Sequence, residues 1–481
     1  MNRKVVFLVI SISALLSSCM VGPKYSKPPV VTAPTYREQP PASFKPVDGW
    51  KPVQPSDALL RSDWWKLFNS AGLNALEDQI EPANQNLKVA EANFNQARQY
   101  ITVNKSYLAP TIAVNPYLDN EHLSSHRPFV VSKGFTSADF YFPADVSYEV
   151  DLWGRIRRTI NAAKESFQAT AADLETVKLS LHAELATDYF EARALDREKR
   201  LLDDTVAQYQ KALTLTQNRF EGGISSKAEV AQAQTQLAQA QAEDLDVGVA
   251  RSQYEHAIAV LTGKNPESFV MKYEPLEGAP PSIPVGVPSQ LLERRPDIAA
   301  AERRMAAINE QIGIAEAAYY PTLSITAAGG FEGNNITNWF TWPSRFWSVG
   351  PQASEVLFDH GIRRARVNIA KYAYDGAVAS YRQTALTAFQ QVEDQLAGLR
   401  ILEQEAAKSH EATQSAENSL QLETNRYKGG LITYLDVVTA QNIALQNERT
   451  EVDIQRRRMS ATIALIMALG GGWDTSKLPV S

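Results

Sequence analysis

The chain has 481 residues, which is enough for two or three ordinary domains or for one elongated domain. Its 48 basic and 54 acidic residues are interleaved and leave a net charge of −6, a balance that argues against a nucleic acid as partner. The 24 glycines and 25 prolines are strongly clustered in a composition typical of folded proteins, and this favours long helices separated by sharp breaks.

The first residues have the parts of a bacterial signal peptide in the required order. A basic start at residues 2–4 precedes an apolar stretch at residues 5–16, which is too short to span a membrane, and small residues then precede Cys19. Cys19 is the only cysteine in the chain. We therefore expect a signal peptide at residues 1–18 and lipidation of Cys19, with an incidental thiol at an ordinary cleavage site as the alternative.

A lipidated N-terminus would be held firmly in a membrane, because each buried methylene of an acyl chain contributes about 0.8 kcal/mol. By resemblance to known bacterial lipoproteins, Met20 after the cysteine favours transfer to the outer membrane over retention in the inner one. The longest later apolar run, at residues 461–469, is too short to predict a transmembrane helix.

The first structural elements of the chain are a helix and two strands. Residues 72–110, which follow the lipidated N-terminal segment at 19–71, predict a first helix that Pro110 ends. Residues 111–152 predict two strands. Apolar and polar side chains alternate over residues 146–152, so one face of the second strand is apolar and the other polar.

A long helical hairpin is predicted for residues 153–262. The stretch Arg155–Phe220 contains no Pro and no Gly, and apolar residues recur in it at intervals of seven along two seams. About 65 helical residues would span close to 100 Å, which no compact domain accommodates. Gly222-Gly223 end this helix, because glycine relieves the strain of a positive φ just past a helix end, and a returning helix follows.

The chain then repeats itself after a linker rich in Pro and Gly at residues 263–295. The stretch 218–224 recurs as 425–431, and three further short motifs recur in the same order at offsets of 207 or 211 residues. Four collinear matches indicate an internal duplication. The second half therefore predicts the same elements: a helix at 296–320, two strands at 321–358, a second long helical hairpin at 359–470 and a C-terminal tail at 471–481.

An aromatic cluster lies between the two strands of the second half. It consists of Trp339, Phe340, Trp342, Phe346 and Trp347. Such a cluster beside alternating strands is typical of the girdle of an outer-membrane barrel, where amphipathic rings lie at the depth of the lipid headgroups. A loop packed on a soluble core is the alternative.

Motifs that carry catalysis are missing. His122 and His126 have helical spacing, but they fall in a predicted loop between strands and lack the glutamate of a zinc-protease motif. Gly263-Lys264 lacks the rest of a phosphate-binding loop, and no nucleophile elbow, paired-cysteine motif or dinucleotide fingerprint is present. The sequence therefore predicts no enzymatic activity, no cofactor and no metal.

Four motifs resemble those of the TolC-type outer-membrane factors, and within them the lipoproteins of the NodT family. They are Asp63-Trp64-Trp65-Lys66-Leu67-Phe68, Leu291-Leu292-Glu293-Arg294-Arg295-Pro296-Asp297-Ile298, the glycine pairs that end both long helices, and Tyr434-Leu435-Asp436-Val437. The resemblance covers nearly the whole chain. It implies an α+β membrane protein in which long helical hairpins form a periplasmic α-barrel and four strands per subunit contribute to a twelve-stranded outer-membrane β-barrel. Four strands cannot close a barrel by themselves, which agrees with the homotrimer that the resemblance implies.

The function implied by this resemblance is the exit duct of a tripartite efflux pump. An RND-type inner-membrane transporter supplies the energy, a periplasmic adaptor protein bridges the two membranes, and the lipid-anchored channel passively conducts drugs or other small molecules across the outer membrane. Two alternatives are the outer channel of a type I protein or peptide secretion system, and a lipid-anchored periplasmic coiled-coil scaffold without a pore.

The resemblance also implies which residues are functional. The periplasmic tips, where adaptor hairpins would dock, comprise Gly222, Gly223, Ile224, Ser225, Gly429, Gly430, Leu431 and Ile432. The periplasmic gate would contain Tyr427, Asp436 and, at the equivalent place in the first repeat, Glu229. Three copies of Asp436 around a threefold axis would form a narrow acidic ring that recruits cations. Two positions depart from the family pattern, since Ile432 stands where some relatives have an arginine that connects neighbouring hairpins, and Thr439 where many have a second aspartate.

Overall fold

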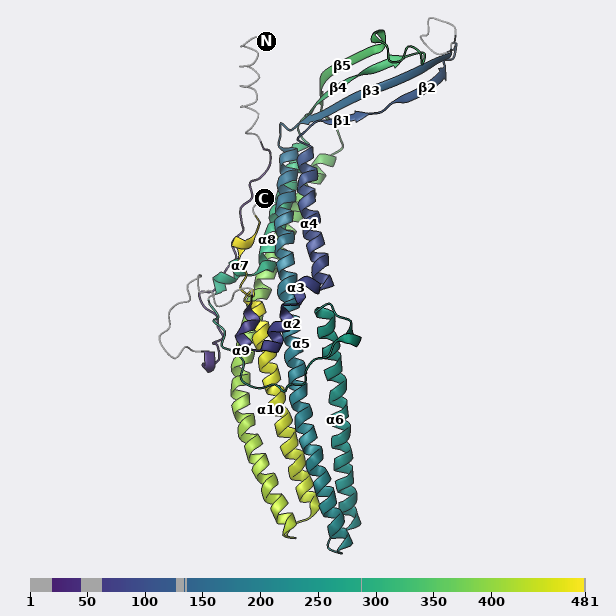
Figure 1. The fold of residues 1–481 in the computed structure, drawn as a ribbon. Coiled ribbons are helices and arrows are strands. Elements are labelled where there is room, and N and C mark those ends of the chain that lie inside the picture. The colour runs from purple at the N-terminus through teal and green to yellow at the C-terminus, as the bar shows by residue number, and fades with distance from the viewer. Residues whose placement is uncertain (1–19, 45–62, 127–133, 135, 287, 480–481) are drawn as a thin grey trace.

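The molecule is elongated, with a β-sheet at one end and a column of helices that ends in two hairpin turns at the other (Figure 1). The computed structural model describes residues 20–44, 63–126, 134, 136–286 and 288–479. The predicted signal peptide and Cys19 lie outside the described residues.

The main helices come in pairs of equal length, which confirms the internal duplication. The pairs are α4 (Gln85–Ser106) and α8 (Pro296–Ala317) with 22 residues each, α5 (Arg155–Glu221) and α9 (Ile362–Lys428) with 67 each, and α6 (Lys227–Leu261) and α10 (Tyr434–Ala468) with 35 each. At 1.5 Å per residue, α5 and α9 are each roughly 100 Å long.

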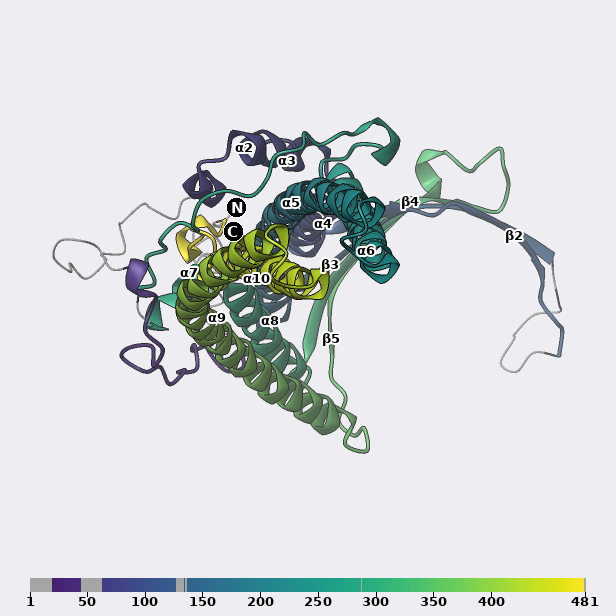
Figure 2. The same cartoon turned by 90° about the horizontal axis from the view of Figure 1, so that it is seen from below.

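Four of these helices lie side by side in the order α9, α10, α5, α6 (Figures 1 and 2). α5 and α6 form one hairpin, α9 and α10 form the other, and α10 packs against α5 to join the two hairpins. α4 and α8 pack on the half of α5 nearer the sheet. The apolar seams predicted for α5 account for this packing, because Leu181, Leu202, Tyr209, Leu185 and Leu213 are all buried.

The sheet is antiparallel, with the order β1–β3–β4–β5. Its strands are β1 (Thr111–Val114), β2 (Tyr117–His122), β3 (Thr136–Val150), β4 (Thr322–Gly333) and β5 (Arg345–Ser354). β2 also pairs with β3, where Tyr117 lies opposite Tyr141, just beyond the pair of Val114 with Ala144. β1 and β2 are thus one strand interrupted at Pro116, which lacks the N–H of a ladder residue. The sheet is four strands wide, as predicted.

Short helices connect and cover these elements. They are α2 (Ala71–Glu77), α3 (Ile80–Ala83), α7 (Leu291–Arg294), and the 3-10 helices η1 (Ala42–Phe44), η2 (Trp64–Phe68), η3 (Pro266–Ser268), η4 (Pro288–Gln290), η5 (Trp342–Ser344) and η6 (Thr475–Lys477). No helix among the described residues combines the length and the apolar character needed to cross a bilayer.

Two sequence-based expectations are wrong in detail. The single helix expected at 72–110 is three helices, α2, α3 and α4. Asn84 separates α3 from α4: its side chain accepts the backbone N–H of Leu87 at 3.0 Å and donates to the carbonyl oxygen of Leu261 at 2.9 Å, so it caps α4 and the end of α6 together. His122, expected in a loop, is the last residue of β2, where its Nδ1 lies 2.8 Å from Oγ1 of Thr136 on β3.

The N-terminal segment runs along the helices from the sheet end toward the middle of the column (Figure 1). At the sheet end, the N–H of Val21 donates to the carbonyl oxygen of Trp153 at 3.1 Å. Further along, the carboxylate of Glu393 on α9 accepts the backbone N–H groups of Arg37 and Glu38 at 2.8 and 2.9 Å. Backbone groups of an extended segment thus find their partners on a helix surface.

Candidate functional site at the hairpin tips

Each hairpin turns through a pair of glycines, and only the second glycine of each pair has a positive φ. Gly223 has a φ of 72° and Gly430 a φ of 74°, and the N–H of the residue after each returns to a helix carbonyl, Ile224 to Arg219 at 2.8 Å and Leu431 to Arg426 at 3.0 Å. This is the helix ending that favours glycine, since any other residue is strained there. The two tips therefore have the same backbone geometry.

The tips present apolar side chains to solvent. Ile224 is 70% exposed, Leu431 75% and Leu435 55%, while Ser225 and Ile432 are half-buried. A β-carbon added at Gly223 would meet no atom within 4 Å, and one added at Gly430 would meet only the guanidinium of Arg219 at 3.9 Å. Open space around a glycine turn flanked by exposed apolar residues is what a partner backbone needs for close approach.

Tyr427 connects the two hairpins near these turns. Its ring is buried, and its hydroxyl lies 3.4 Å from Oε2 of Glu229 on α6 and 3.4 Å from Oγ1 of Thr216 on α5. Burial of the ring, and then the nearby Glu229 carboxylate, raise the pKa of Tyr427, so the hydroxyl stays protonated and able to donate. The structure thus brings together two of the residues predicted for the gate.

Arg219 strengthens the same connection. Its guanidinium carbon lies 4.6 Å from the centre of the Tyr427 ring, and its Nη1 donates to the carbonyl oxygen of Tyr427 at 3.0 Å. A cation over an aromatic face, combined with a charge-assisted hydrogen bond, holds the end of α9 against the end of α5.

Asp436 and Thr439 do not take part in this contact. Both are exposed, and both bond to their own helix: Oδ2 of Asp436 accepts the N–H of Thr433 at 3.0 Å and its hydroxyl at 2.9 Å, and the hydroxyl of Thr439 donates to the carbonyl oxygen of Leu435 at 2.9 Å. Asp436 is therefore the third helical residue of a capping box at the start of α10. Its predicted place in an acidic ring stays a prediction.

Sequence reasoning missed Arg219 and Thr216. A signal was present, because the repeated Asn-Arg-aromatic motif places an arginine before an aromatic residue at the end of both long helices. In the sequence alone, this motif indicates only the duplication. The partner of Arg219 lies 208 residues away, so no local pattern identifies it.

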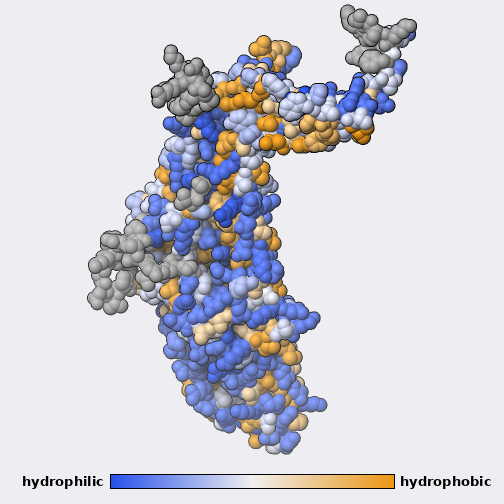
Figure 3. Space-filling view, turned by 45° about the horizontal axis from the view of Figure 1, so that its top comes forward, coloured by the Kyte–Doolittle hydropathy of each residue, from blue (hydrophilic) through white to orange (hydrophobic). Residues whose placement is uncertain are grey.

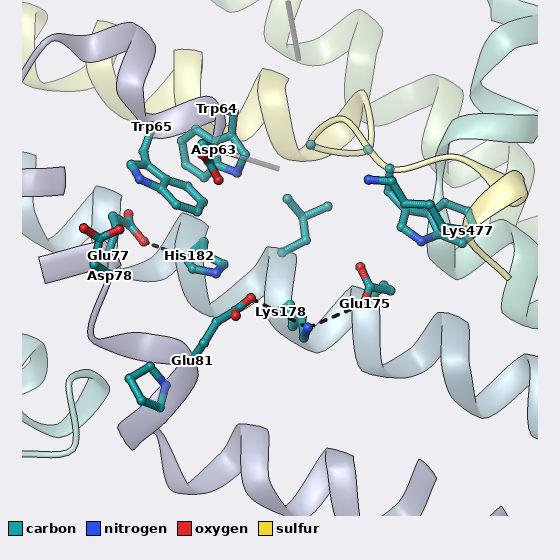
Figure 4. A pocket seen from close by; sticks show the side chains of 15 residues that line it. Asp63, Trp64, Trp65, Glu77, Asp78, Glu81, Glu175, Lys178, His182 and Lys477 are labelled. Carbon is teal, nitrogen blue, oxygen red and sulfur yellow. Dashed lines mark hydrogen bonds and ion pairs between the residues drawn. The ribbon is translucent and has the colours of Figure 1, made fainter. Parts of the chain in front are cut away.

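A pocket of about 420 Å³ lies at the middle of the column, beside the tryptophan motif that precedes α2 (Figure 4). Trp65 stacks on His182 of α5 with ring centres 4.3 Å apart, and Nδ1 of His182 lies 2.6 Å from Oε2 of Glu77. Burial raises the pKa of Glu77 to about 7. Lys178, on the same face of α5, lies 3.6 Å from Glu81 and is directed into the pocket in Figure 4.

These contacts explain the tryptophan motif as structural. Trp64 and Trp65 are nearly inaccessible and belong to the large apolar cluster around α5, so they fix the N-terminal segment to the column. Among the described residues, no group of three or more His, Cys, Asp or Glu is arranged to hold a metal ion.

The string Leu291–Ile298 has a comparable role through Arg295. The guanidinium of Arg295 donates to Oε1 of Gln391 on α9 at 2.7 Å, to the carbonyl oxygen of Ala468 at the end of α10 at 3.1 Å, and to the carboxylate of Asp297. Arg295 is 8% exposed. One buried arginine thus satisfies a helix C-terminus and fixes α8 to the second hairpin, which gives Arg295 and Asp297 a structural role.

Apolar side chains gather at the other end of the molecule, along the sheet and at its junction with the helices, whereas the column is largely hydrophilic (Figure 3). Exposed residues of this apolar surface are Ile112, Val114, Tyr117, Leu118, Ile325, Trp347 and Val349. At the loop end of the sheet, Trp339 and Phe340 stack with ring centres 4.7 Å apart. At the helix end, Trp153 and Tyr320 stack at 4.6 Å.

The model of the family described as "Outer membrane efflux protein" matches residues 76–264 and 287–471, which correspond to the two repeats. Among curated relatives, the "Probable efflux pump outer membrane protein TtgC" of Pseudomonas putida is 26% identical over 95% of this chain and 94% of its own length. The "Solvent efflux pump outer membrane protein SrpC" of Pseudomonas putida is 29% identical over 96% of this chain and 97% of its own.

Solved structures have the same fold. The outer-membrane channel OprN superposes with a TM-score of 0.85 at 28% identity, over 95% of this chain and all of its own. The Campylobacter jejuni CmeC outer membrane channel superposes with a TM-score of 0.88 at 23% identity, over 95% of this chain and 96% of its own.

Proposed function

Because the chain belongs to the outer membrane efflux protein family, and is thus a non-enzymatic outer-membrane efflux channel, we propose that it acts as a lipid-anchored homotrimer that forms the exit duct of a tripartite pump. Membership of a channel family argues against a scaffold without a pore. The names of the relatives favour efflux of small molecules over secretion of proteins.

The sheet supports the trimer. In the described part of the chain, β5 pairs only with β4, and β1 and β2 pair only with β3, so both outer edges carry free backbone groups. Backbone groups cannot stay unpaired in lipid, and a barrel that contains these strands must take further strands from other copies. Three copies of a sheet four strands wide give a twelve-stranded barrel.

The aromatic stacks support the position of this barrel in the membrane. Trp153 with Tyr320 and Trp339 with Phe340 lie at opposite ends of β4, which has 12 residues. Such a strand is roughly 40 Å long, or about 28–33 Å along the axis of a barrel with the usual tilt. That is enough to span the apolar band of an outer-membrane barrel, which is about 25 Å tall, and to reach the aromatic girdle on each side of it.

The start of the N-terminal segment supports the lipid anchor. Met20 packs against Gly154, and Val21 bonds to Trp153, so the residues that directly follow Cys19 lie at the aromatic stack at the helix end of the sheet. An acyl chain attached one residue earlier would start at the level of the headgroups, where it can enter the bilayer without strain in the protein.

The proposed cargo is inferred from the names of the relatives, and the proposed partners are inferred from the geometry of the hairpin tips. Relatives are named for efflux of toluene, solvents and antibiotics, so the cargo proposed here is small organic molecules. The partner proposed at the tips is a periplasmic adaptor, with an RND-type inner-membrane transporter behind it. The observation that carries this is the pair of equal glycine turns with open space around them and exposed Ile224 and Leu431 beside them.

Two measurements on the purified protein, its mass in detergent and its ion conductance, test whether it is a trimeric channel. In mild detergent, light scattering should give three times the mass of the mature subunit, which is the chain mass of 53.2 kDa less the predicted signal peptide, and the same sample should form ion-conducting pores in planar bilayers. A stable monomer that conducts no ions would contradict both the trimer and the duct.

A further inference from the structure

The duplication gives each tip the same pair of residues, an arginine followed by an aromatic residue. These are Arg219-Phe220 at the end of α5 and Arg426-Tyr427 at the end of α9, 207 residues apart. Within one chain, Arg219 of the first repeat contacts Tyr427 of the second. The complementary pair, Arg426 and Phe220, does not meet within one chain.

The order of the helices determines where the complementary pair would meet. Within a chain, the second helix of one hairpin (α10) packs against the first helix of the other (α5). In the proposed trimer, the outer helix α6 of one copy packs against the outer helix α9 of the next, which is again a second helix against a first. We call each of these contacts between hairpins a joint. The joint between copies therefore has the same arrangement as the joint within a copy, with the first and second repeats exchanged.

The two complementary side chains are available for this contact. Phe220 is 44% exposed, whereas its counterpart Tyr427 is 3% exposed. The side chain of Arg426 is 54% exposed, and its Nη1 lies 3.0 Å from Oε1 of Glu423, one turn earlier on α9. That ion pair directs the guanidinium without covering its faces, so a ring can still stack on it.

We propose that Arg426 of one copy lies over the Phe220 ring of the neighbouring copy and donates to the carbonyl oxygen of that Phe220, so that a cation–π contact closes each joint between subunits at the periplasmic tip. This inference rests on the proposed trimer. It assigns a role to Arg426 and Phe220, which the predicted docking and gate residues do not include.

The joint within a copy and the joint between copies differ in one hydroxyl group. Within a chain, the hydroxyl of Tyr427 reaches Glu229 and Thr216, but Phe220 has no hydroxyl for the equivalent residues, Asp436 and Glu423. The carboxylate of Asp436 is instead bonded to Thr433. The joints between copies therefore have fewer contacts than those within a copy, and they separate first when the tip opens.

Site-specific cross-linking tests the contact. With a short thiol-reactive cross-linker, Phe220→Cys combined with Arg426→Cys should produce covalent dimers and trimers, and neither single variant should. The matched control is Arg219→Cys with Tyr427→Cys, which should form a link within one chain, visible by peptide mass mapping. A trimer by light scattering in which the control pair reacts and the test pair links no copies overturns the contact and leaves the proposed function intact; a monomer overturns both.

Measurements of the open fraction of the channel test whether the joints between copies are held closed by the contact of Arg426 with Phe220. In planar bilayers, Arg426→Gln and Phe220→Leu should each raise the open fraction, by about two- to fivefold for each joint that must separate. Phe220→Tyr restores the missing hydroxyl toward Asp436 and should lower the open fraction below that of the unmodified channel. Equal open fractions in all three variants and the unmodified trimer would overturn the inference.

Discussion

Nη1 of Arg219 donates to the carbonyl oxygen of Tyr427 at 3.0 Å although the two residues are 208 apart in sequence, and the same guanidinium covers the Tyr427 ring. One arginine of the first repeat therefore fixes the end of the second repeat. Replacing it removes both contacts while leaving the apolar cluster around Tyr209 and Tyr434 in place.

Arg219→Ala should loosen the tip, because a cation–π contact and a charge-assisted hydrogen bond together contribute on the order of 2 kcal/mol. We expect longer openings in planar bilayers and higher passage of large antibiotics into intact cells. Arg219→Lys keeps the charge but not the planar group, and it should give an intermediate effect. Unchanged gating in the alanine variant, at a normal trimer level, would show that this contact does not hold the tip closed.

Bulky side chains at the tips should block docking of the adaptor. Gly223→Trp combined with Gly430→Trp should reduce efflux and leave the amount of trimer in the outer membrane unchanged, because a β-carbon added at Gly223 meets no atom within 4 Å and one added at Gly430 meets only the flexible guanidinium of Arg219, at 3.9 Å. The control is alanine at both positions, which imposes the same positive-φ strain of roughly 1 kcal/mol with little bulk. If the alanine pair impairs efflux as much as the tryptophan pair, strain explains the loss and docking does not.

Removing the charge of Asp436 should weaken block by divalent or trivalent cations applied from the periplasmic side. Asp436→Asn is the informative variant, because the amide oxygen can still accept the N–H of Thr433 and preserve the helix cap. Asp436→Ala removes the charge together with one of the two bonds of the capping box, and should in addition destabilise the start of α10 by roughly 0.5–1 kcal/mol, because Thr433 remains as the N-cap. Cation block that matches the unmodified channel in the asparagine variant would place Asp436 away from the constriction.

Cys19→Ser should abolish lipidation, since the thiol is the predicted attachment site and the only one in the chain. Metabolic labelling with palmitate should mark the unmodified protein and not the serine variant. Partial efflux should survive, because the proposed barrel would also hold the protein in the membrane. Label retained by the serine variant would refute the assignment.

Glu448 makes the stability of the helical column depend on pH. Burial, and then the neighbouring Glu417 carboxylate, raise the pKa of Glu448 from 4.5 to about 7. Folding thus favours its protonated form, and stability falls as the pH rises from about 4.5 to about 7. Glu448→Gln should raise the free energy of unfolding at pH 8 by roughly 1–2 kcal/mol per subunit after allowance for solvent screening, and with it the thermal midpoint, and it should have little effect at pH 4. A pH-independent shift in circular dichroism melts would exclude this cause.

The sequence was sufficient for those features that local patterns encode. The long helices follow from the absence of Pro and Gly between residues 155 and 220, and the strands from alternation. The break at Asn84 was not predictable, because half of its capping role is a bond to Leu261, 177 residues away. The same reason hides the partners of Arg219 and Arg295. The bonds of Asp436 to Thr433, in contrast, follow a local pattern, because Thr433-Tyr434-Leu435-Asp436 has the spacing of a capping box.

α5 runs without a break from the sheet to the hairpin tip, and the contacts of Trp65 with His182 and of Arg295 with Gln391 hold the column together near its middle. His182 is 39 residues from the end of α5 at Glu221, or roughly 60 Å along the helix axis. The column can therefore act as a lever with its pivot at that height. A tilt of about 5° there would displace the tip by roughly 5 Å, enough to part a cation from a ring, while the strands beyond the pivot keep their register.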